Sequence, residues 1–422
     1  MRAILKNGRV IDPASGRDGA GDIAIENGRI CRPSGQAEEI IDCRGMIVAP
    51  GLVDMHVHLR EPGREDKETV ESGTAAAVRG GVTTVLAMAN TQPAMDSPET
   101  VQLLKEIIRK TARSRVAVCA AITMNRIGKE LVDVARLRKE GVVAISDDGV
   151  SVESAELMRK ALRKARESKV AVLCHCEDPA LSSGGVMNLG FVSTKLGLRG
   201  IPAESEYRRI QRDIELAEKE KAAVHICHVS CAESIELIQK AKKKGIKVTC
   251  ETAPHYFTLT EEDLFDYDTR LKMNPPLRCV RDRDAVIQAL AKGTIDVIAS
   301  DHAPHTIGEK DIEFDRAEFG VIGLETELAV SATALVGTGI IGWPELIRKL
   351  SLNPARILGL DAGTLAVGAP ADIVVIDPER EWAVRKEEFL SASRNSPFIG
   401  RTVKGRVEYT IVNGSVVYKA GA

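Results

Sequence analysis

The pattern of hydrophobic and polar residues differs between the two ends of the chain and its middle. Short β-rich runs separated by turns occupy the two ends, 1–50 and 366–422. Asn-Gly pairs at 7–8, 27–28 and 413–414 lie in these ends and are a strong local signal for hairpins. We therefore predict that the two ends pair into one small β-sandwich domain. Two separate flaps, one at each end, are the alternative.

The middle of the chain, 51–365, alternates between short apolar, β-branched runs and amphipathic helical stretches. Near-continuous apolar runs are typical of parallel strands that helices cover. The expected strands are 47–57, 82–88, 116–121, 142–145, 170–174, 223–227, 247–250 and 296–299. The expected helices are 68–79, 99–111, 129–139, 153–168, 205–221, 232–244, 281–292 and 324–336.

Eight strand–helix repeats predict an α/β fold of one type, a closed (β/α)8 TIM barrel. A doubly wound open sheet is the rival fold. It is disfavoured because no glycine-rich, phosphate-binding sequence follows the first strand.

Two connections, 178–204 and 302–320, are longer than the others. Both would leave the C-terminal end of a barrel strand, which is where active sites of such barrels lie. Structureless segments longer than about 12–15 residues are usually functional. We interpret both as candidate lids, with surface elaboration as the alternative.

Composition narrows the class of protein. Lys+Arg total 58 and Asp+Glu total 60, and this balance excludes a basic nucleic-acid-binding surface as a global feature. No run of about 18 apolar residues is present, so we expect no membrane span. Nine cysteines without an apolar secretory signal lead us to expect a reducing, cytoplasmic setting.

Side chains that bind metals recur at the expected C-terminal ends of five strands. His56 and His58 are two positions apart, so both face the same side of their strand and can bind one ion. The carboxyl ends of parallel strands meet at one rim of a barrel, so this pattern predicts a metal site there. The other residues at strand ends are Asp147, Asp148, His175, His228 and Asp301.

The motifs that contain these residues resemble those of the dihydroorotases, within the cyclic amidohydrolase family. The H-x-H element alone is shared with allantoinases and hydantoinases, whereas the motif at 299–310 is more specific. The resemblance covers essentially the whole chain. The matching segments are DMHVHLREPG (54–63), MANTQPAMDSP (88–98), SDDG (146–149), HCED (175–178), ETAPH (251–255), LKMNPPLR (271–278) and ASDHAPHTIGEK (299–310).

The resemblance implies a zinc enzyme with one or two ions in each chain. The wider family often bridges two metals with a carbamylated lysine at the end of the fourth strand. This chain has Asp147-Asp148 there, which resembles the subgroup that uses aspartate, and Asp147 is the alternative to Asp148 as ligand. Asp301 is also implied as the proton shuttle. The implied ligands are His56, His58, Asp148, His175, His228 and Asp301.

The implied reaction is the reversible cyclisation of N-carbamoyl-L-aspartate to dihydroorotate in pyrimidine biosynthesis. Arg60 can clamp the unreactive carboxylate of this substrate with two parallel hydrogen bonds. The implied substrate contacts are Arg60, Asn90, Asn274, His305, and the backbone around Phe319 and Gly320.

Two other functions remain alternatives. One is another cyclic amidohydrolase, of the allantoinase or dihydropyrimidinase type. The other is a non-catalytic scaffold, which is disfavoured because all six implied ligands are present. The resemblance also implies a possible complex with aspartate transcarbamoylase.

The remaining histidines and two cysteines are expected to be structural. By strand alternation His225 faces away from the site and packs under a helix, and His302 points away as well. His255 either orients a ligand or is structural. Cys174 and Cys176 are expected as small buried side chains that do not bind the metal.

Overall fold

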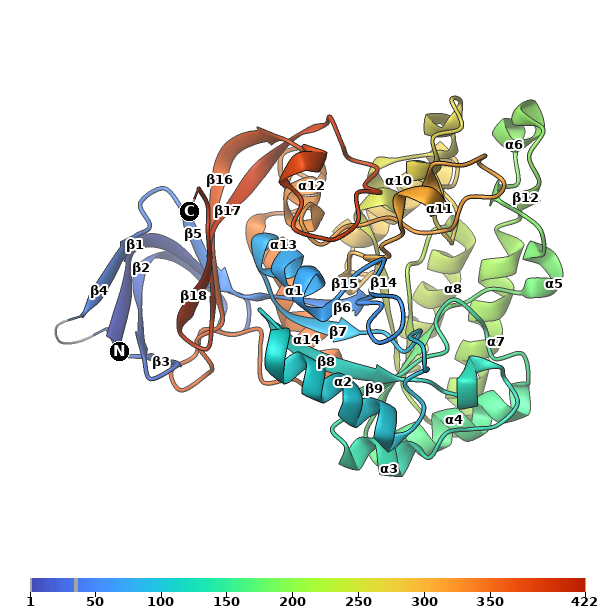
Figure 1. Ribbon diagram of the computed structural model, residues 1–422, viewed down its shortest axis with the longest axis horizontal. Coiled ribbons are helices and arrows are strands. Elements are labelled where there is room, and N and C mark those ends of the chain that lie inside the picture. The colour runs from blue at the N-terminus through green and yellow to red at the C-terminus, as the bar shows by residue number, and fades with distance from the viewer. Residues whose placement is uncertain (1, 34–36, 422) are drawn as a thin grey trace.

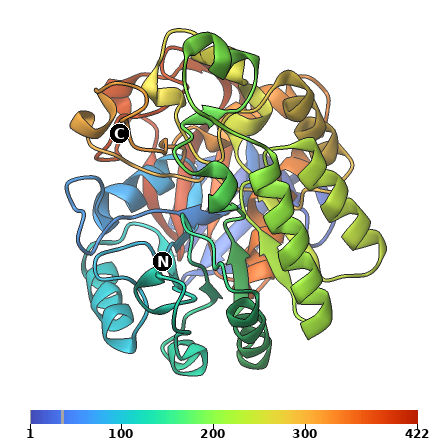
Figure 2. The ribbon, with the colours of Figure 1, turned by 90° about the vertical axis from the view of Figure 1, so that its right-hand side faces the viewer.

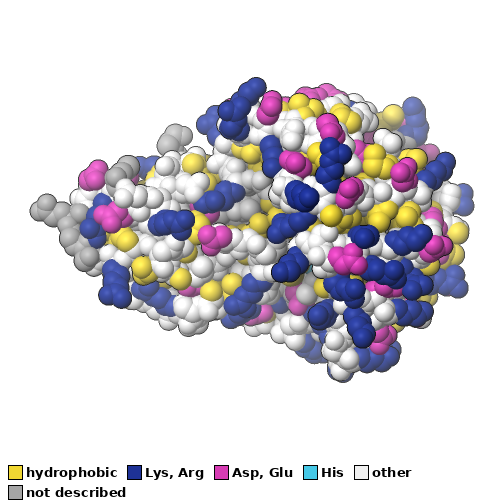
Figure 3. Space-filling model, turned by 90° about the horizontal axis from the view of Figure 1, so that it is seen from below, with side chains coloured by type: hydrophobic (Ala, Val, Ile, Leu, Met, Phe, Trp, Pro, Cys, Tyr) yellow, Lys and Arg dark blue, Asp and Glu magenta, His cyan; other side chains and the backbone are white. Residues whose placement is uncertain are grey.

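The computed structural model describes residues 2–33 and 37–421. An open sheet lies at one end of the molecule and a barrel of parallel strands at the other (Figure 1). Among the described residues, no helix is long and apolar enough to cross a membrane. Basic and acidic side chains are interspersed over the face in Figure 3, so this face is not uniformly basic.

The two ends of the chain form one eight-stranded mixed sheet, as expected. They join where Ile47–Pro50 runs antiparallel to Ile373–Ala383, with Val48 opposite Val375. The strand order is β18-β17-β16-β5-β1-β2-β3, and β4 pairs with β1. The strands are β1 (Arg2–Asp12), β2 (Arg17–Glu26), β3 (Arg29–Cys31), β4 (Glu39–Asp42), β5 (Ile47–Pro50), β16 (Ile373–Ala383), β17 (Thr402–Val412) and β18 (Ser415–Lys419).

Two of the three Asn-Gly pairs form hairpin turns, and the first does not. The pair at 27–28 joins β2 to β3, and the pair at 413–414 joins β17 to β18. Asn7, with a φ of 65°, lies instead inside β1, where the register with β2 shifts. A Cβ on Gly8 would lie 2.7 Å from Val48 Cγ2. The expected hairpin at 7–8 is therefore wrong, because this pair makes a bulge that lets β5 approach closely.

Eight parallel strands form the barrel, in the order β6-β7-β8-β9-β10-β13-β14-β15. The ring closes where Val57 bridges to His302, and His58 N donates to His302 O at 2.9 Å. This closure confirms the (β/α)8 barrel over the open sheet. The strands are β6 (Leu52–Val57), β7 (Val82–Ala87), β8 (Arg115–Ala120), β9 (Ala144–Ile145), β10 (Ala171–Cys174), β13 (Val224–Ile226), β14 (Val248–Thr252) and β15 (Val297–Ile298).

The helices surround the barrel (Figures 1 and 2). Outward side chains such as Val85 and Val172 belong to the large core that includes the helices. Leu86 and Leu173, one position along, fill the inside of the barrel. The main helices are α1 (Val70–Arg79), α2 (Pro98–Thr111), α3 (Val134–Lys139), α4 (Ala155–Ser168), α7 (Glu204–Glu220), α8 (Ala232–Lys243), α10 (Val280–Ala291), α12 (Glu327–Ser331), α13 (Trp343–Ile347) and α14 (Asn353–Leu358).

Shorter helical turns complete the fold. They lie mostly in the connections between barrel strands, and two of them extend α12 and α13. The turns are η1 (Met124–Arg126), α9 (Pro254–Thr258), η2 (Glu261–Leu264), η3 (Thr269–Leu271), η4 (Ala332–Val336), η5 (Arg348–Leu352) and η6 (Lys386–Glu388).

The expected strand at 47–57 is divided between the sheet and the barrel. β5 ends at Pro50, and β6 begins at Leu52. A Cβ on Gly51 would collide with the Thr83 side chain, so glycine lets the chain pass close to β7 as it enters the barrel. The apolar run at 47–57 is uninterrupted in the sequence, although the chain passes from the sheet to the barrel within it.

The long connections contain regular structure, so the expectation that they are structureless is wrong. Arg278 holds the first one to the barrel, because its Nη1 donates to Asn188 Oδ1 and to Ile201 O, both at 2.9 Å. The elements in 178–204 are α5 (Pro179–Ser182), β11 (Met187–Asn188), α6 (Phe191–Leu196) and β12 (Gly200–Ile201), and 302–320 contains α11 (Ile307–Lys310).

Candidate active site

Six buried side chains from five barrel strands meet at the C-terminal rim of the barrel. Asp148 lies at the centre: its Oδ1 is 3.3 Å from His56 Nε2, and its Oδ2 is 3.5 Å from His58 Nε2. The same Oδ1 is 3.7 Å from both His175 Nδ1 and His228 Nε2. The predicted ligands are therefore brought together around one carboxylate.

Asp301 completes one side of this cluster. Its Oδ1 lies 3.5 Å from His56 Nε2 and 3.4 Å from His58 Nε2. On the other side, His175 Nδ1 lies 2.9 Å from His228 Nε2. The cluster thus offers two neighbouring positions for an ion, with Asp148 between them.

The second ring nitrogen of three of these histidines contacts an oxygen acceptor. A carboxylate or amide oxygen can only accept, so the partnered nitrogen carries the hydrogen and the other nitrogen faces the cluster, where it can bind an ion. The contacts are His56 Nδ1 to Glu251 Oε1 (2.6 Å), His58 Nδ1 to Asn90 Oδ1 (2.7 Å) and His175 Nε2 to Glu177 Oε2 (3.1 Å).

The donor atoms fit a divalent cation. Among the described residues, the buried atoms His56 Nε2 and Asp148 Oδ1 have no hydrogen-bond partner. His56, His58 and Asp301 offer ligand atoms that all lie within 4.8 Å of one another, as do His56, Asp148 and His228. Imidazole and carboxylate ligands in this number suit zinc. The residues therefore form a candidate metal site.

The two central carboxyl groups are ionised. Burial alone would raise the pKa of Asp148, but His56 and the neighbouring imidazoles hold it well below its usual range. Burial also opposes ionisation of Asp301, and His56 and His58 again lower its pKa overall. Both carboxylates are therefore available to bind a cation.

Asp147, the alternative ligand, has a different environment. Its Oδ1 accepts hydrogen bonds from Ile122 N at 2.8 Å and Thr123 N at 3.0 Å. Its Oδ2 accepts from the Thr123 hydroxyl. Both oxygens thus hold the loop after β8, and the geometry favours Asp148 as the ligand.

Arg60 and His305 lie together beside the cluster. Arg60 Nη2 is 3.4 Å from His305 Nε2, and Arg60 Nε donates to Pro304 O at 3.2 Å. Burial lowers the pKa of Arg60 to about 10, so the guanidinium stays charged at neutral pH. Arg60 has a φ of 61°, and Asp301 and His228 are also in the left-handed region, where strain often marks functional sites.

The asparagines implied as substrate contacts each bind another residue of the site. Asn90 accepts from His58 through Oδ1. Asn274 Nδ2 donates to Glu177 Oε2 at 3.0 Å, and Glu177 in turn accepts from His175. Each asparagine therefore helps to orient a candidate ligand, and its contact with substrate stays a prediction.

The backbone around Phe319 and Gly320 lies next to His305. Phe319 O accepts from His305 Nε2 at 2.8 Å, and Gly320 O accepts from Lys310 Nζ at 3.0 Å. Gly320 N donates to Lys272 O at 2.9 Å. The closure of this backbone on a substrate stays a prediction.

The expectation for His225 is wrong. His225 Nε2 contacts Glu251 Oε2 at 3.1 Å, so the ring lies inside the barrel behind His56, not under a helix. Strand alternation fails here because β13 ends at Ile226, and His228 has a φ of 37°. Neither Glu251 nor Glu177 was assigned a role from the sequence, although both lie within the matched motifs.

The other histidines and Cys176 lie outside the cluster. His302 points away and contacts Glu68 Oε2 at 3.1 Å, as expected. His255 packs against Tyr256 with ring centroids 4.2 Å apart. Cys176 Sγ contacts Asp213 Oδ2, on α7, at 3.6 Å, so the thiol faces the helices.

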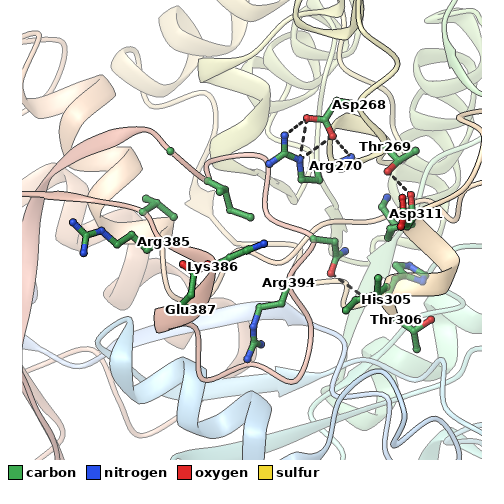
Figure 4. Close-up of a pocket in the computed structure, with 16 residues that line it drawn as sticks. Asp268, Thr269, Arg270, His305, Thr306, Asp311, Arg385, Lys386, Glu387 and Arg394 are labelled. Carbon is green, nitrogen blue, oxygen red and sulfur yellow. Dashed lines mark hydrogen bonds and ion pairs between the residues drawn. The ribbon is translucent and has the colours of Figure 1, made fainter.

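A pocket of about 870 Å³ opens beside the cluster, not over it. It lies between the barrel loops at 268–270 and 305–311 and the C-terminal segment 384–400 (Figure 4). Of the predicted site residues, only His305 lines it. The candidate metal ligands therefore lie outside this pocket. The charged lining is mixed: Arg270, Lys310, Arg385, Lys386 and Arg394, with Asp268, Asp311 and Glu387.

Known proteins resemble this chain over its whole length. Residues 45–234 match a family model described as dihydro-orotase-like, and 341–418 match the amidohydrolase family. The dihydroorotase of Elusimicrobium minutum is 49% identical, over 100% of this chain and 98% of the relative. The chain belongs to the dihydroorotase family. The dihydroorotase of Geobacter metallireducens is 48% identical, over 99% of this chain and 100% of the relative.

Solved structures of other cyclic amidohydrolases share the fold of this dihydroorotase-family chain. L-hydantoinase (dihydropyrimidinase) from Arthrobacter aurescens superimposes with a TM-score of 0.90 at 25% identity, over 100% of this chain and 96% of that one. Dihydropyrimidinase from Brevibacillus agri has a TM-score of 0.87 at 26% identity, over 99% and 95%. The fold and the family together identify the chain as a cyclic amide hydrolase.

Proposed function

We propose that the chain is a zinc-dependent dihydroorotase, which interconverts N-carbamoyl-L-aspartate and dihydroorotate in pyrimidine biosynthesis. One observation carries the proposal: four imidazoles and two carboxylates converge at the barrel rim of a chain whose full-length relatives are dihydroorotases. A scaffold protein has no need to keep such a set of buried donors.

The cluster would hold one or two ions, one on each side. His56, His58 and Asp301 would hold the first, and His175 and His228 the second, with Asp148 shared between them. Bound zinc would supply a water of lowered pKa and polarise the ring carbonyl.

Asp301 would move the proton. Its ionised carboxylate lies among the ligands, within reach of a water or a substrate nitrogen held there. In hydrolysis it takes the proton of the water and delivers it to the departing ring nitrogen. In ring closure it takes the proton of the ureido nitrogen as that nitrogen attacks the β-carboxyl carbon, and it delivers this proton to the departing hydroxyl, which leaves as water.

Arg60 and His305 would bind the substrate carboxylate that does not react. The guanidinium offers a planar pair of donors, and the ring of His305 lies beside it. Asn90 uses its Oδ1 on His58, which leaves its amide N–H groups for a substrate oxygen. Asn274 uses its N–H on Glu177, which leaves its Oδ1 for a ring N–H.

A substrate panel tests this function. Ring closure of N-carbamoyl-L-aspartate and hydrolysis of dihydroorotate are measured beside hydrolysis of allantoin and dihydrouracil, with metal content determined on the same sample. Dihydrouracil lacks the carboxylate, so we expect kcat/KM for dihydroorotate to be greater by roughly 10³-fold or more. Arg60→Met should reduce that ratio steeply. A preference for allantoin or dihydrouracil would refute the proposal.

Two further properties belong to this proposal. A cytoplasmic location is supported by the nine cysteines, all of which are free thiols. A complex with aspartate transcarbamoylase is expected from the family. Co-elution of the two purified proteins from a sizing column would support the complex, and separate elution at micromolar concentration would contradict it.

A further inference from the structure

Lys67 is a buried lysine that the reaction above does not use. It lies between β6 and α1, and its side chain is 8% exposed. Its Nζ lies 3.1 Å from His305 Nδ1 and 2.9 Å from Glu309 Oε1. Lysine is almost never buried without a partner, so the two contacts indicate a specific role.

The partners of the His305 ring determine which nitrogen carries the hydrogen. An ammonium group only donates, so Nδ1 accepts from Lys67 and keeps a lone pair. A carbonyl oxygen only accepts, so Nε2, 2.8 Å from Phe319 O, carries the hydrogen. A neutral imidazole has one such hydrogen. The donor Arg60 Nη2 also lies near Nε2, but at 3.4 Å it is farther than either of these two contacts, which together assign the hydrogen to Nε2.

The surroundings of the ring also keep it neutral. Burial, followed by the charges of Arg60, Lys67 and Lys310, lowers the pKa of His305 to about 2. Among the described residues, the acid that contacts the ring is Glu309, whose Oε2 lies 3.5 Å from Nδ1. The other oxygen of that carboxylate pairs with Lys67, so one negative charge faces the three cations.

We propose that Lys67 is a positioning residue that locks His305 as a neutral Nε2–H donor for the carboxylate of the substrate. The inference rests on the proposed dihydroorotase function. In the free enzyme this N–H is given to Phe319 O, with Arg60 Nη2 3.4 Å from the same nitrogen. When a substrate oxygen replaces the carbonyl, one neutral donor and one guanidinium act on a single carboxylate.

The other tautomer would fail at this task. With the hydrogen on Nδ1, His305 would present a lone pair to the substrate oxygen and repel it, and Lys67 would lose its acceptor. Because the carboxylate does not react, this loss affects binding more than the chemical step. We therefore expect Lys67 to act on KM and only weakly on kcat.

Three variants separate this role from a structural one. Lys67→Met keeps the aliphatic stem and removes the donor, and Lys67→Arg restores a cationic donor. Lys349→Met is the matched control, because Lys349 is also a buried ammonium, held by Ile295 O at 2.8 Å at the opposite end of the barrel.

Two measurements are made on the metal-loaded protein. Nitrogen-15 NMR of the histidine rings, with His305 assigned by the loss of its signals in His305→Gln, should show only the Nε2–H form between pH 6 and 8. In Lys67→Met, His305 should become a mixture of tautomers, because Nδ1 no longer faces an ammonium donor. KM for dihydroorotate should rise about tenfold, equivalent to about 1.4 kcal/mol, with kcat within about threefold. Lys67→Arg should stay near wild type, and Lys349→Met should change neither quantity.

Three results would overturn the inference. They are a wild-type His305 with its hydrogen on Nδ1, a charged His305 at pH 6–8, and a Lys67→Met variant with unchanged tautomer and KM. The wild-type spectrum decides the tautomer even if Lys67→Met fails to fold. It also requires no substrate, so a failure of the proposed function in the substrate panel is distinguishable from a failure here.

Discussion

The metal half of the site, which comprises the six candidate ligands, is supported differently from the substrate half, which comprises Arg60, His305 and Gly320. Ligands of the metal half lie in a barrel strand or within three residues after one, and His56 is oriented by a residue of the barrel itself, Glu251 on β14. The substrate half lies on loops. The metal half should therefore tolerate changes outside the barrel, and the substrate half should not.

The substrate half is held by the segment between β16 and β17. Asn395 Nδ2 donates to Gly320 O at 3.0 Å and to Ala303 O at 3.2 Å, while its Oδ1 accepts from His305 N at 3.3 Å. Ser393 Oγ contacts both His305 O and Lys67 O, at 2.9 and 2.7 Å. The C-terminal part of the chain thus positions the loops that are expected to bind substrate.

The largest expected effect is in the metal half. Asp301→Asn should lower kcat by about 10³-fold or more, because positioned acid–base groups contribute about 10²–10⁴-fold. Its amide oxygen still offers a ligand atom, so metal content should stay close to wild type. Steady-state kinetics and elemental analysis of one sample measure both. A near-normal rate would remove Asp301 as the proton shuttle.

A matched pair of variants tests the centre of the cluster. Asp148→Asn should lose bound metal and at least about 10²-fold of activity, because this carboxylate contacts four imidazoles. Asp147→Asn should keep the metal but lose about 1–3 kcal/mol of stability, since Asp147 accepts from Ile122 N and Thr123 N. Metal analysis and denaturant unfolding distinguish the two. The reverse outcome would make Asp147 the ligand.

Replacing a residue that orients a ligand of the metal half is expected to have a smaller effect than replacing a ligand itself. Glu251→Gln should weaken metal affinity by roughly 10–100-fold, because Glu251 orients His56. Competition with a chelator measures the affinity. Asp213→Asn is the control, since this buried carboxylate contacts Cys176 and Arg212 away from the cluster. Equal affinity in both variants would contradict the orienting role.

The smallest effect is expected in the substrate half. Asn395→Ala should raise KM for dihydroorotate about three- to tenfold, because Gly320 and His305 lose a shared tether, while metal content stays unchanged. Asn353→Ala is the control, since Asn353 Nδ2 donates to Asp296 O at the other end of the barrel. Loss of metal in Asn395→Ala would remove the distinction between the two halves.

The metal half could be predicted from the sequence because its ligands follow from local patterns. His56 and His58 share a face through alternation, and the strand repeat brings distant strand ends to one rim. The same reasoning left Asp147 and Asp148 unresolved, because β9 is two residues long and alternation does not extend into the loop after it. It failed for His225 because His228 lies beyond the end of its strand.

The support of the substrate half could not be predicted, because it depends on contacts between distant parts of the chain. Lys67 and His305 are 238 positions apart, and Asn395 lies 90 positions from His305. Neither residue belongs to a local pattern that indicates a partner. The change of sheet at Gly51 was hidden for a similar reason, since it depends on the close approach of Thr83.

Zinc titration of chelator-treated protein tests the metal-dependent dihydroorotase function most directly. Hydrolysis of dihydroorotate is followed while zinc is added back to the metal-free protein, and bound zinc is measured at each point. We expect no turnover without metal, and a rate that rises in proportion to bound zinc up to one or two equivalents per chain. Full turnover of dihydroorotate by metal-free protein would contradict the function assigned to the cluster.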